Sequence, residues 1–285
     1  MTSPRLRRSL LFVPGSRPER FPKAMAAGAD IVCIDLEDAV LPADKAMARH
    51  HVIEALPQLA RKSELAIRIN TLRSRDGLED ILALARSDTP PDIVAIPKAE
   101  SAAELAIVSA IFAEAGHTPL LAPLVETLAG LANADSICAA PHVAFVVLGT
   151  ADLGGEMGIG MDWDAMLHAR HLLVTAAKRA GVEAMDGAWL QLDDADGLAA
   201  ETRRVAGLGF TAKICLHPRQ VHAVHTALLP TEAEVIAARS LVEAWQAAAT
   251  GAFQHQGKMI DLPVLNAARR KLAAWEREHG TAHTE

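Results

Sequence analysis

Short apolar runs recur along the chain, and six of them end in charged or polar residues. The residues at these ends are Asp35 with Glu37 and Asp38 close behind it, Arg68, Lys98, Glu126, Asp152 and His217. Most of the runs lie roughly 25 to 35 residues apart with helical patterns between them, a spacing that predicts parallel strands connected by helices. In an α/β barrel, the C-terminal ends of the strands carry the active site, so these polar residues are the first candidates for chemistry.

Eight such runs favour a closed (β/α)8 TIM barrel over an open sheet. We expect strands at residues 9–13, 31–35, 65–69, 92–96, 120–125, 144–148, 182–185 and 212–216. Runs such as VAFVVL lack an apolar/polar alternation, as expected when helices cover both faces of a parallel sheet. Ser101 and Glu104 have the spacing of a capping box, which supports a helix between two of the strands.

The pattern changes after the eighth strand. We expect the barrel to occupy residues 1–229 and a C-terminal helical extension to occupy residues 230–285. Thr231 and Glu234 have the spacing of a second capping box before a helical stretch. The segment GAFQHQGKMIDLP interrupts this stretch, and VLNAARRKLAAWEREHG predicts a final helix. The extension could pack on its own barrel or reach a neighbouring subunit and complete the neighbour's site.

Composition limits the class of protein. The chain has 285 residues, of which 51% are hydrophobic and 22% charged, enough for one barrel-sized domain and an appendage. A formal net charge of -7 provides no basic face for nucleic acid. No run reaches the roughly 18 apolar residues of a membrane span, and the first apolar run is too short for a signal peptide. Three cysteines without a CxxC motif indicate free thiols, so we expect a cytoplasmic protein with small-molecule partners.

Glu126 and Asp152 end neighbouring runs and are the candidate metal ligands. Carboxylate oxygens are typical ligands of Mg²⁺, which is commonly held by one or two carboxylates together with substrate oxygens and water. The alternative is that both residues cap the helices that follow them, because acidic residues are favoured at helix N-termini.

Two further features carry positive charge. Arg68 lies in a predicted interior strand, where it needs a partner; it could bind a carboxylate of a ligand, form a structural ion pair with Glu37 or Asp38, or do both. Lys98 has the same two interpretations. The N-terminal region is locally basic and could bind the phosphates of a substrate such as coenzyme A, or be a solvated surface. Its basic residues are Arg5, Arg7, Arg8, Arg17, Arg20 and Lys23.

Seven segments, in order and spacing, resemble the HpcH/HpaI aldolase and citrate lyase β-subunit family. They are RSLLFVPGSRPERFPKA, DIVCIDLEDAV, RIN, IPKAES, VETLAG, GTADLGGEMG and GFTAKICLHPRQV. The resemblance implies a (β/α)8 barrel in a homotrimer or hexamer, and a carbon–carbon lyase acting on acyl thioesters. It implies Mg²⁺, or Mn²⁺, bound by Glu126 and Asp152, and an oxoacid held by Arg68. The backbone of Gly149, Thr150, Ala151 and Asp152 would lie beside the oxoacid, and Arg17 and Lys23 would contact coenzyme A.

The segment QGKMIDLPVLNAARR is similar to the C-terminal part of malyl-CoA, β-methylmalyl-CoA and citramalyl-CoA lyases. This similarity implies that Asp261 is an acid/base residue that enters the site of an adjacent subunit. An ordinary helix cap is the alternative role for Asp261.

The implied reaction splits a citramalyl-CoA or malyl-CoA type substrate into acetyl-CoA and pyruvate or glyoxylate. The alternatives are a citrate lyase β subunit acting on an acyl-carrier-protein thioester, and a non-catalytic barrel with an assembly or regulatory role.

Overall fold

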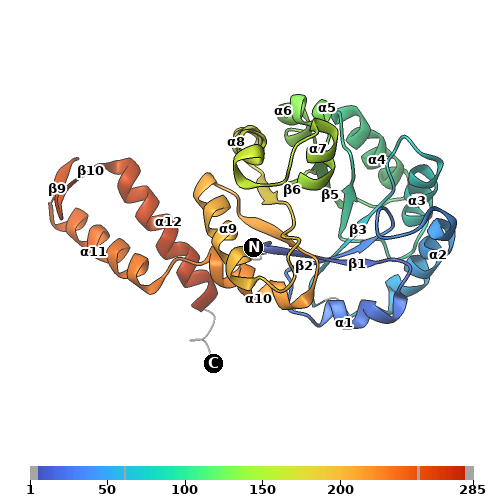
Figure 1. Cartoon of the computed structure of the whole chain (residues 1–285), viewed down its shortest axis with the longest axis horizontal. Coiled ribbons are helices and arrows are strands. Elements are labelled where there is room, and N and C mark those ends of the chain that lie inside the picture. Colours follow the sequence, from blue (N-terminus) through green and yellow to red (C-terminus); the bar gives the residue numbers. More distant parts are fainter. Residues whose placement is uncertain (1–5, 61, 249–250, 280–285) are drawn as a thin grey trace. The chain divides into compact units, whose positions relative to one another are not determined.

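The computed structural model of the chain describes residues 6–60, 62–248 and 251–279. The chain divides between Thr226 and Ala227 into two compact units. The first unit is a closed barrel of parallel strands with helices around it, and the second is a helical hairpin (Figure 1).

All eight strands expected from the apolar runs are confirmed, and each end lies within one residue of its expected position. Each strand pairs in parallel with the next, and β8 pairs with β1 to close the barrel. The strands are β1 Ser9–Pro14, β2 Ile31–Asp35, β3 Glu64–Arg68, β4 Ile93–Ile96, β5 Leu120–Val125, β6 Phe145–Leu148, β7 Glu183–Asp186 and β8 Ala212–Cys215.

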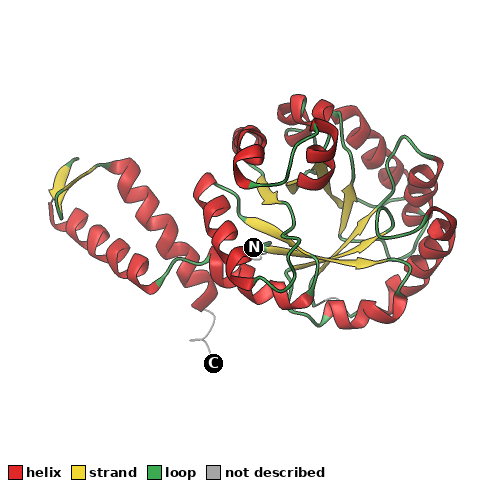
Figure 2. Cartoon of the chain, viewed as in Figure 1, coloured by secondary structure: helices red, strands yellow, loops and turns green. Residues whose placement is uncertain are grey.

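Helices form the outer layer around the strands, as Figure 2 shows. The capping box at Ser101 and Glu104 is confirmed at the start of α4. No helix in the part of the chain that the structure describes is long and apolar enough to cross a membrane. The helices of the barrel are α1 Phe21–Met25, α2 Lys45–Ala55, α3 Arg75–Ala85, α4 Ala102–Glu114, α5 Leu128–Ala132, α6 Ala134–Cys138, α7 Thr150–Met157, α8 Trp163–Ala180, α9 Ala195–Leu208 and α10 Pro218–Leu228.

Alternate residues of the strands fill the interior of the barrel. Side chains along a strand point alternately to its two sides, so every second residue shares the same side. The interior cluster is Leu10, Ile31, Cys33, Ala66, Ile93, Ala95, Ala122, Leu124, Phe145, Val147, Met185, Ala212 and Ile214. Asp35, Arg68 and Glu126 continue this series at the C-terminal ends of β2, β3 and β5, so the apolar interior gives way there to a polar layer.

The strand residues that face outward, toward the helices, include a buried charged cluster. Asp186 on β7 and Lys213 on β8 are completely buried, and the buried Arg170 of α8 contacts Asp186. The Asp186 carboxylate accepts from Lys213 Nζ at 2.7 Å and from Arg170 Nε at 2.9 Å. Burial opposes ionisation of Asp186, but the two cations outweigh it and lower its pKa. The cluster joins the last two strands to the helix layer.

The second unit contains α11 Glu232–Ala248, the hairpin β9 Phe253–His255 and β10 Lys258–Ile260, and α12 Leu262–His279. The capping box of Thr231 and Glu234 is confirmed by reciprocal backbone hydrogen bonds of 3.0 and 3.2 Å. These two strands were not predicted from the sequence. Gln256 and Gly257, which connect the two strands, both have positive φ, as in a type I′ turn. A two-residue connection that ends in glycine is the sequence feature that could have predicted this hairpin.

The buried charged cluster generates a stability prediction. In Lys213→Met, only Arg170 remains to compensate the buried charge of Asp186, in place of two cations. We therefore expect the free energy of unfolding to fall by about 3 kcal/mol or more. Arg179→Met is the matched control in the same barrel, because it breaks only the exposed ion pair with Asp135. Its loss should stay below about 1 kcal/mol. Urea unfolding of both variants measures the difference, and equal losses would contradict the interpretation.

Candidate active site at the barrel mouth

Glu126 is a deeply buried carboxylate at the C-terminal end of the barrel, which we call the mouth. The residue directly follows β5 and is only 2% exposed. Its Oε1 accepts the backbone N–H of Lys98 at 2.8 Å. Gly149, at the end of the neighbouring strand β6, lies against Oε2, where the Cβ of any other residue would collide with the carboxylate. The packing at this point therefore makes room for a carboxylate.

Negative charge exceeds positive charge at the mouth. Burial, and then the neighbouring carboxylates of Glu37 and Asp152, raise the pKa of Glu126 to about 8. A bound cation would relieve this repulsion, so the charge distribution favours a cation ligand. Five carboxyl groups, Asp35, Glu37, Asp38, Glu126 and Asp152, are in contact or electrostatic interaction with two cations, Arg68 and Lys98.

The segment from Gly149 to Asp152 lies beside Glu126 and begins α7. Gly149 precedes the helix, and its N–H donates to the Val125 carbonyl at 3.1 Å. Thr150 is buried, Ala151 is exposed, and the Asp152 side chain, in the first turn of α7, is 35% exposed. The structure thus brings together the two carboxylates that sequence analysis selected, one of them buried and the other accessible.

Arg68 is held in a fork by Asp35, its register partner on β2. Its Nε and Nη2 donate to the two Asp35 oxygens at 2.7 and 2.6 Å, and Nη1 lies 3.1 Å from Glu37 Oε2. The guanidinium also lies over the Phe12 ring, 4.6 Å from its centroid. Burial disfavours the charge, but the carboxylates outweigh it and raise the pKa of Arg68. The guanidinium is therefore charged and fixed in orientation.

The expected structural partners of Arg68 were Glu37 or Asp38, and the outcome is mixed. The Glu37 pair is present, whereas Asp38 lies 3.9 Å from Lys98 Nζ. Asp35 was missed as the principal partner, although its place opposite Arg68 follows from the strand register once both strands are aligned.

Lys98 connects the carboxylates across the mouth. Its Nζ lies 2.5 Å from Glu37 Oε1 and 3.3 Å from Asp152 Oδ1. Its backbone has a φ of 50°, a left-handed conformation that is uncommon for a residue with a side chain. Both the backbone N–H and the ammonium group of Lys98 thus contact mouth carboxylates.

The basic N-terminal residues form two groups rather than one surface. Arg7 and Arg8 precede β1 and pair with Glu64 at 2.6 Å and Asp30 at 2.9 Å, at the end of the barrel opposite the mouth. Arg17, Arg20 and Lys23 follow β1 at the mouth end, where all three are exposed. Arg5 lies outside the described residues. β1 therefore separates these described cations into one group at the mouth and one at the opposite end.

The remaining candidates have local contacts. Asp261 precedes α12 in the second unit and caps it, since its Oδ1 accepts the Val264 N–H at 3.2 Å. The capping role considered for Asp261 is therefore present, and the bond uses one carboxylate oxygen. His217 Nδ1 accepts from the backbone N–H and Nε of Arg219, both at 3.2 Å, at the start of α10.

The side chains at the mouth suit a divalent cation that takes only some of its ligands from the protein. In the described part of the chain, no three His, Cys, Asp or Glu side chains are grouped as metal ligands. Two carboxylates, Glu126 and Asp152, with an excess of negative charge around them, match the preference of Mg²⁺ for few carboxylates plus substrate oxygens and water.

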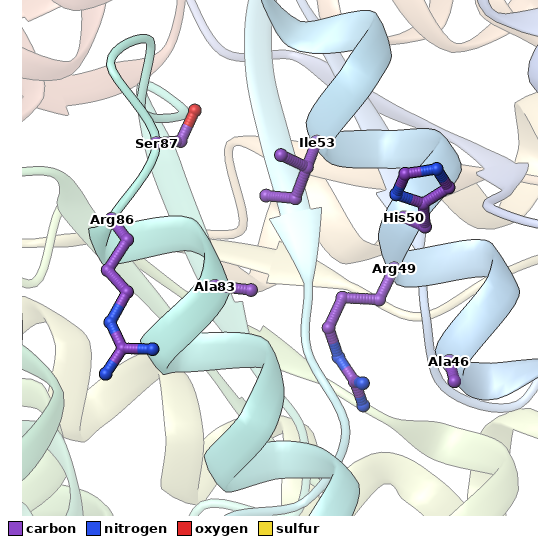
Figure 3. Close-up of a pocket in the computed structure, with 7 residues that line it drawn as sticks. All are labelled: Ala46, Arg49, His50, Ile53, Ala83, Arg86 and Ser87. Atoms are coloured by element: carbon purple, nitrogen blue, oxygen red, sulfur yellow. The ribbon is translucent and has the colours of Figure 1, made fainter.

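A separate hollow of about 380 Å³ lies between α2 and α3 (Figure 3). Its lining residues are Ala46, Arg49, His50, Ile53, Ala83, Arg86 and Ser87. Arg49 there is already paired with Asp76, Glu79 and Asp80 at 2.6 to 3.0 Å. Glu126, Asp152 and Arg68 lie at the mouth, and we assign the candidate site there.

Comparisons with known proteins identify the family of the chain. The family model HpcH/HpaI aldolase/citrate lyase matches residues 8–218. The citrate lyase subunit beta of Leuconostoc mesenteroides is 33% identical, with 98% of this chain and 96% of the relative covered. The L-malyl-CoA/beta-methylmalyl-CoA lyase of Cereibacter sphaeroides is 33% identical, with 92% of each chain covered.

Among solved structures, the protein CitE from Mycobacterium tuberculosis, in complex with magnesium, acetoacetate and coenzyme A, is 34% identical with a TM-score of 0.84. The similarity covers 94% of this chain and 98% of CitE. The residue-level resemblance, the eight-stranded barrel and these matches agree over nearly the whole length. The chain belongs to the HpcH/HpaI aldolase/citrate lyase family of carbon–carbon lyases.

Proposed function

We propose that the barrel mouth cleaves a 3-hydroxyacyl-CoA of the citramalyl-CoA or malyl-CoA type into acetyl-CoA and a 2-oxoacid, pyruvate or glyoxylate. The observation that carries this proposal is the pair of carboxylates, Glu126 and Asp152, beside the fixed guanidinium of Arg68. The similarity to an L-malyl-CoA/beta-methylmalyl-CoA lyase and to a structure in complex with coenzyme A supports the thioester part of the substrate.

Glu126 and Asp152 would hold Mg²⁺, or Mn²⁺ in its place. When bound, the ion supplies Lewis-acid polarisation of the oxygen that becomes the oxoacid carbonyl. The carboxylates bring the ion to the mouth, and the buried environment around Glu126 keeps their interaction with it strong.

Arg68 would bind and stabilise the oxoacid oxygens. A guanidinium has five N–H donors, and hydrogen bonds to Asp35 use those of Nε and one of Nη2. Nη1 forms an ion pair with Glu37 Oε2 that is not a hydrogen bond. The second N–H of Nη2 and the N–H groups of Nη1 would bind a ligand oxygen. Because Asp35 holds the plane of the guanidinium, these donors are oriented before the substrate binds.

Asp261 would move the proton at the acetyl carbon, accepting it during condensation and returning it during cleavage. The capping bond engages Oδ1 and leaves the second oxygen for this role. We propose that Asp261 acts in the mouth of an adjacent subunit of a homotrimer or hexamer.

Arg17 and Lys23 would bind the phosphates of coenzyme A. Both are exposed, and both follow β1 on the mouth side of the barrel. Exposed cations on that side can bind phosphate without the cost of breaking a buried ion pair, in contrast to Arg7 and Arg8.

A citrate lyase β subunit acting on an acyl-carrier-protein thioester is the second candidate. The Leuconostoc relative named citrate lyase subunit beta favours it. A substrate panel with the purified chain and Mg²⁺ separates the two. Turnover of malyl-CoA or citramalyl-CoA by this chain alone supports the CoA lyase, whereas turnover of only a citryl thioester on an acyl carrier protein supports the second candidate.

The metal assignment generates the first functional prediction. Glu126→Gln removes one proposed ligand charge while keeping the side-chain volume, so kcat/KM should fall by about 100-fold or more. EDTA should abolish wild-type activity, and added Mg²⁺ should restore it. Glu114→Gln, an exposed change at the end of α4, is the control and should behave as wild type. Full wild-type activity in EDTA would disprove a metal-dependent reaction.

A second functional prediction concerns Asp261. Asn caps helices about as well as Asp, so Asp261→Asn should keep α12 intact and leave Mg²⁺ affinity unchanged. The kcat should nevertheless fall by about 100-fold or more, because the acid/base group is lost. Steady-state kinetics, Mg²⁺ titration and thermal unfolding measure the three properties.

Mixed oligomers test whether Asp261 acts between subunits. Oligomers assembled from Asp261→Asn and Glu126→Gln chains contain some mouths that receive both wild-type residues if the site is shared. Partial recovery of activity is then expected. No recovery from fully mixed oligomers would contradict action in a neighbouring subunit.

A further inference from the structure

The turn between β4 and α4 holds Lys98 in a strained conformation. With a φ of 50°, Lys98 is one of three non-glycine residues with positive φ in the described chain, with His142 and Gln256. Such residues keep this backbone only where surrounding contacts determine it. The conformation aligns two groups at once, because the N–H donates to Glu126 Oε1 while Nζ lies 3.3 Å from Asp152 Oδ1.

One side chain from another loop holds the carbonyl of this turn. Arg73, between β3 and α3, donates from Nη2 to the Lys98 carbonyl at 3.0 Å. The next residue of the turn is fixed by backbone, since the Ala99 N–H donates to the Leu124 carbonyl at 3.1 Å. The peptide after Lys98 is therefore fixed at its oxygen by Arg73 and at its nitrogen by β5.

Arg73 is itself oriented by the capping box of α4. Its Nη1 lies 2.8 Å from Glu104 Oε1 and 3.0 Å from Glu100 Oε2. The other Glu104 oxygen accepts the N–H groups of Glu100 and Ser101 at 2.7 and 3.2 Å. Glu104 thus links the start of α4 to Arg73, and Arg73 links both to Lys98.

We propose that Arg73 is a positioning residue for the metal ligand Glu126, acting through the carbonyl and the left-handed backbone of Lys98. The inference rests on the proposed function in one respect, that Glu126 binds a divalent cation. Without the Arg73 bond, Lys98 relaxes towards negative φ and its N–H turns away from Glu126. The carboxylate then loses the donor that fixes its orientation toward the ion.

Mn²⁺ binding, followed by electron paramagnetic resonance and titration calorimetry without substrate, tests this inference. Arg73→Gln should weaken Mn²⁺ binding about threefold to tenfold, the equilibrium factor expected for one lost hydrogen bond. KM for the thioester, measured at saturating metal, should stay unchanged. Arg75→Gln is the matched control, because Arg75 is exposed and pairs with Glu79 and should bind Mn²⁺ as wild type does.

Lys98→Gly provides an independent test of the mechanism. Glycine adopts a φ of 50° without strain and keeps the N–H, so the turn needs Arg73 less in this background. Arg73→Gln should therefore change Mn²⁺ affinity less in the Lys98→Gly protein than in wild type. An equal loss in both backgrounds would show that Arg73 does not act through the Lys98 backbone.

The outcomes separate this inference from the proposed function. If Glu126→Gln leaves Mn²⁺ binding unchanged, the metal assignment fails and the inference fails with it. If Glu126→Gln abolishes binding but Arg73→Gln binds as wild type, only the inference is overturned. Thermal unfolding checks each fold. If Arg73→Gln does not fold, Arg73→Lys replaces it as the test, because lysine keeps the positive charge but loses the forked guanidinium. Arg73→Lys should show a smaller loss of Mn²⁺ affinity. Wild-type Mn²⁺ affinity in Arg73→Lys would overturn the inference.

Discussion

The burial of Glu126 is the electrostatic constraint around which the barrel mouth is arranged. A carboxylate that is 2% exposed and close to two other carboxylates is costly unless its surroundings compensate it. The Lys98 N–H and the space beside Gly149 provide a position for it, and the cations of the mouth supply part of the missing charge. The strained turn, the glycine and the ion pairs around this carboxylate are consistent with that single requirement.

The barrel meets the requirement through strand geometry. One side of each strand supplies the apolar interior, and the same series ends in Asp35, Arg68 and Glu126 where three strands leave the barrel. The apolar layer below holds these residues rigidly, because it is closed on all sides by paired strands. Reactive groups on strand ends are thus positioned by the most stable part of the fold, which is the arrangement that preorganised binding requires.

Positive charge at the mouth is divided between two different tasks. Asp35 and Glu37 fix Arg68 and keep it charged, so this side chain can present oriented donors. Lys98 instead links Glu37 with Asp152 through one ammonium group and reaches Glu126 through its backbone. A planar, forked guanidinium suits the first task and a compact ammonium on a flexible stem suits the second. The two cations are therefore not interchangeable.

Sequence alone determined the barrel, because eight apolar runs separated by helical patterns have a spacing that few folds satisfy. It also determined the two capping boxes, because their chemistry is local. It also selected Glu126, Asp152 and Arg68. Tertiary structure alone decided the partners of these residues. Asp35 meets Arg68 through strand register, Arg73 meets Lys98 across two loops, and β1 separates the N-terminal cations into two groups. Such contacts join residues that are distant in the chain, and no local pattern encodes which of several similar charges will meet once the barrel closes.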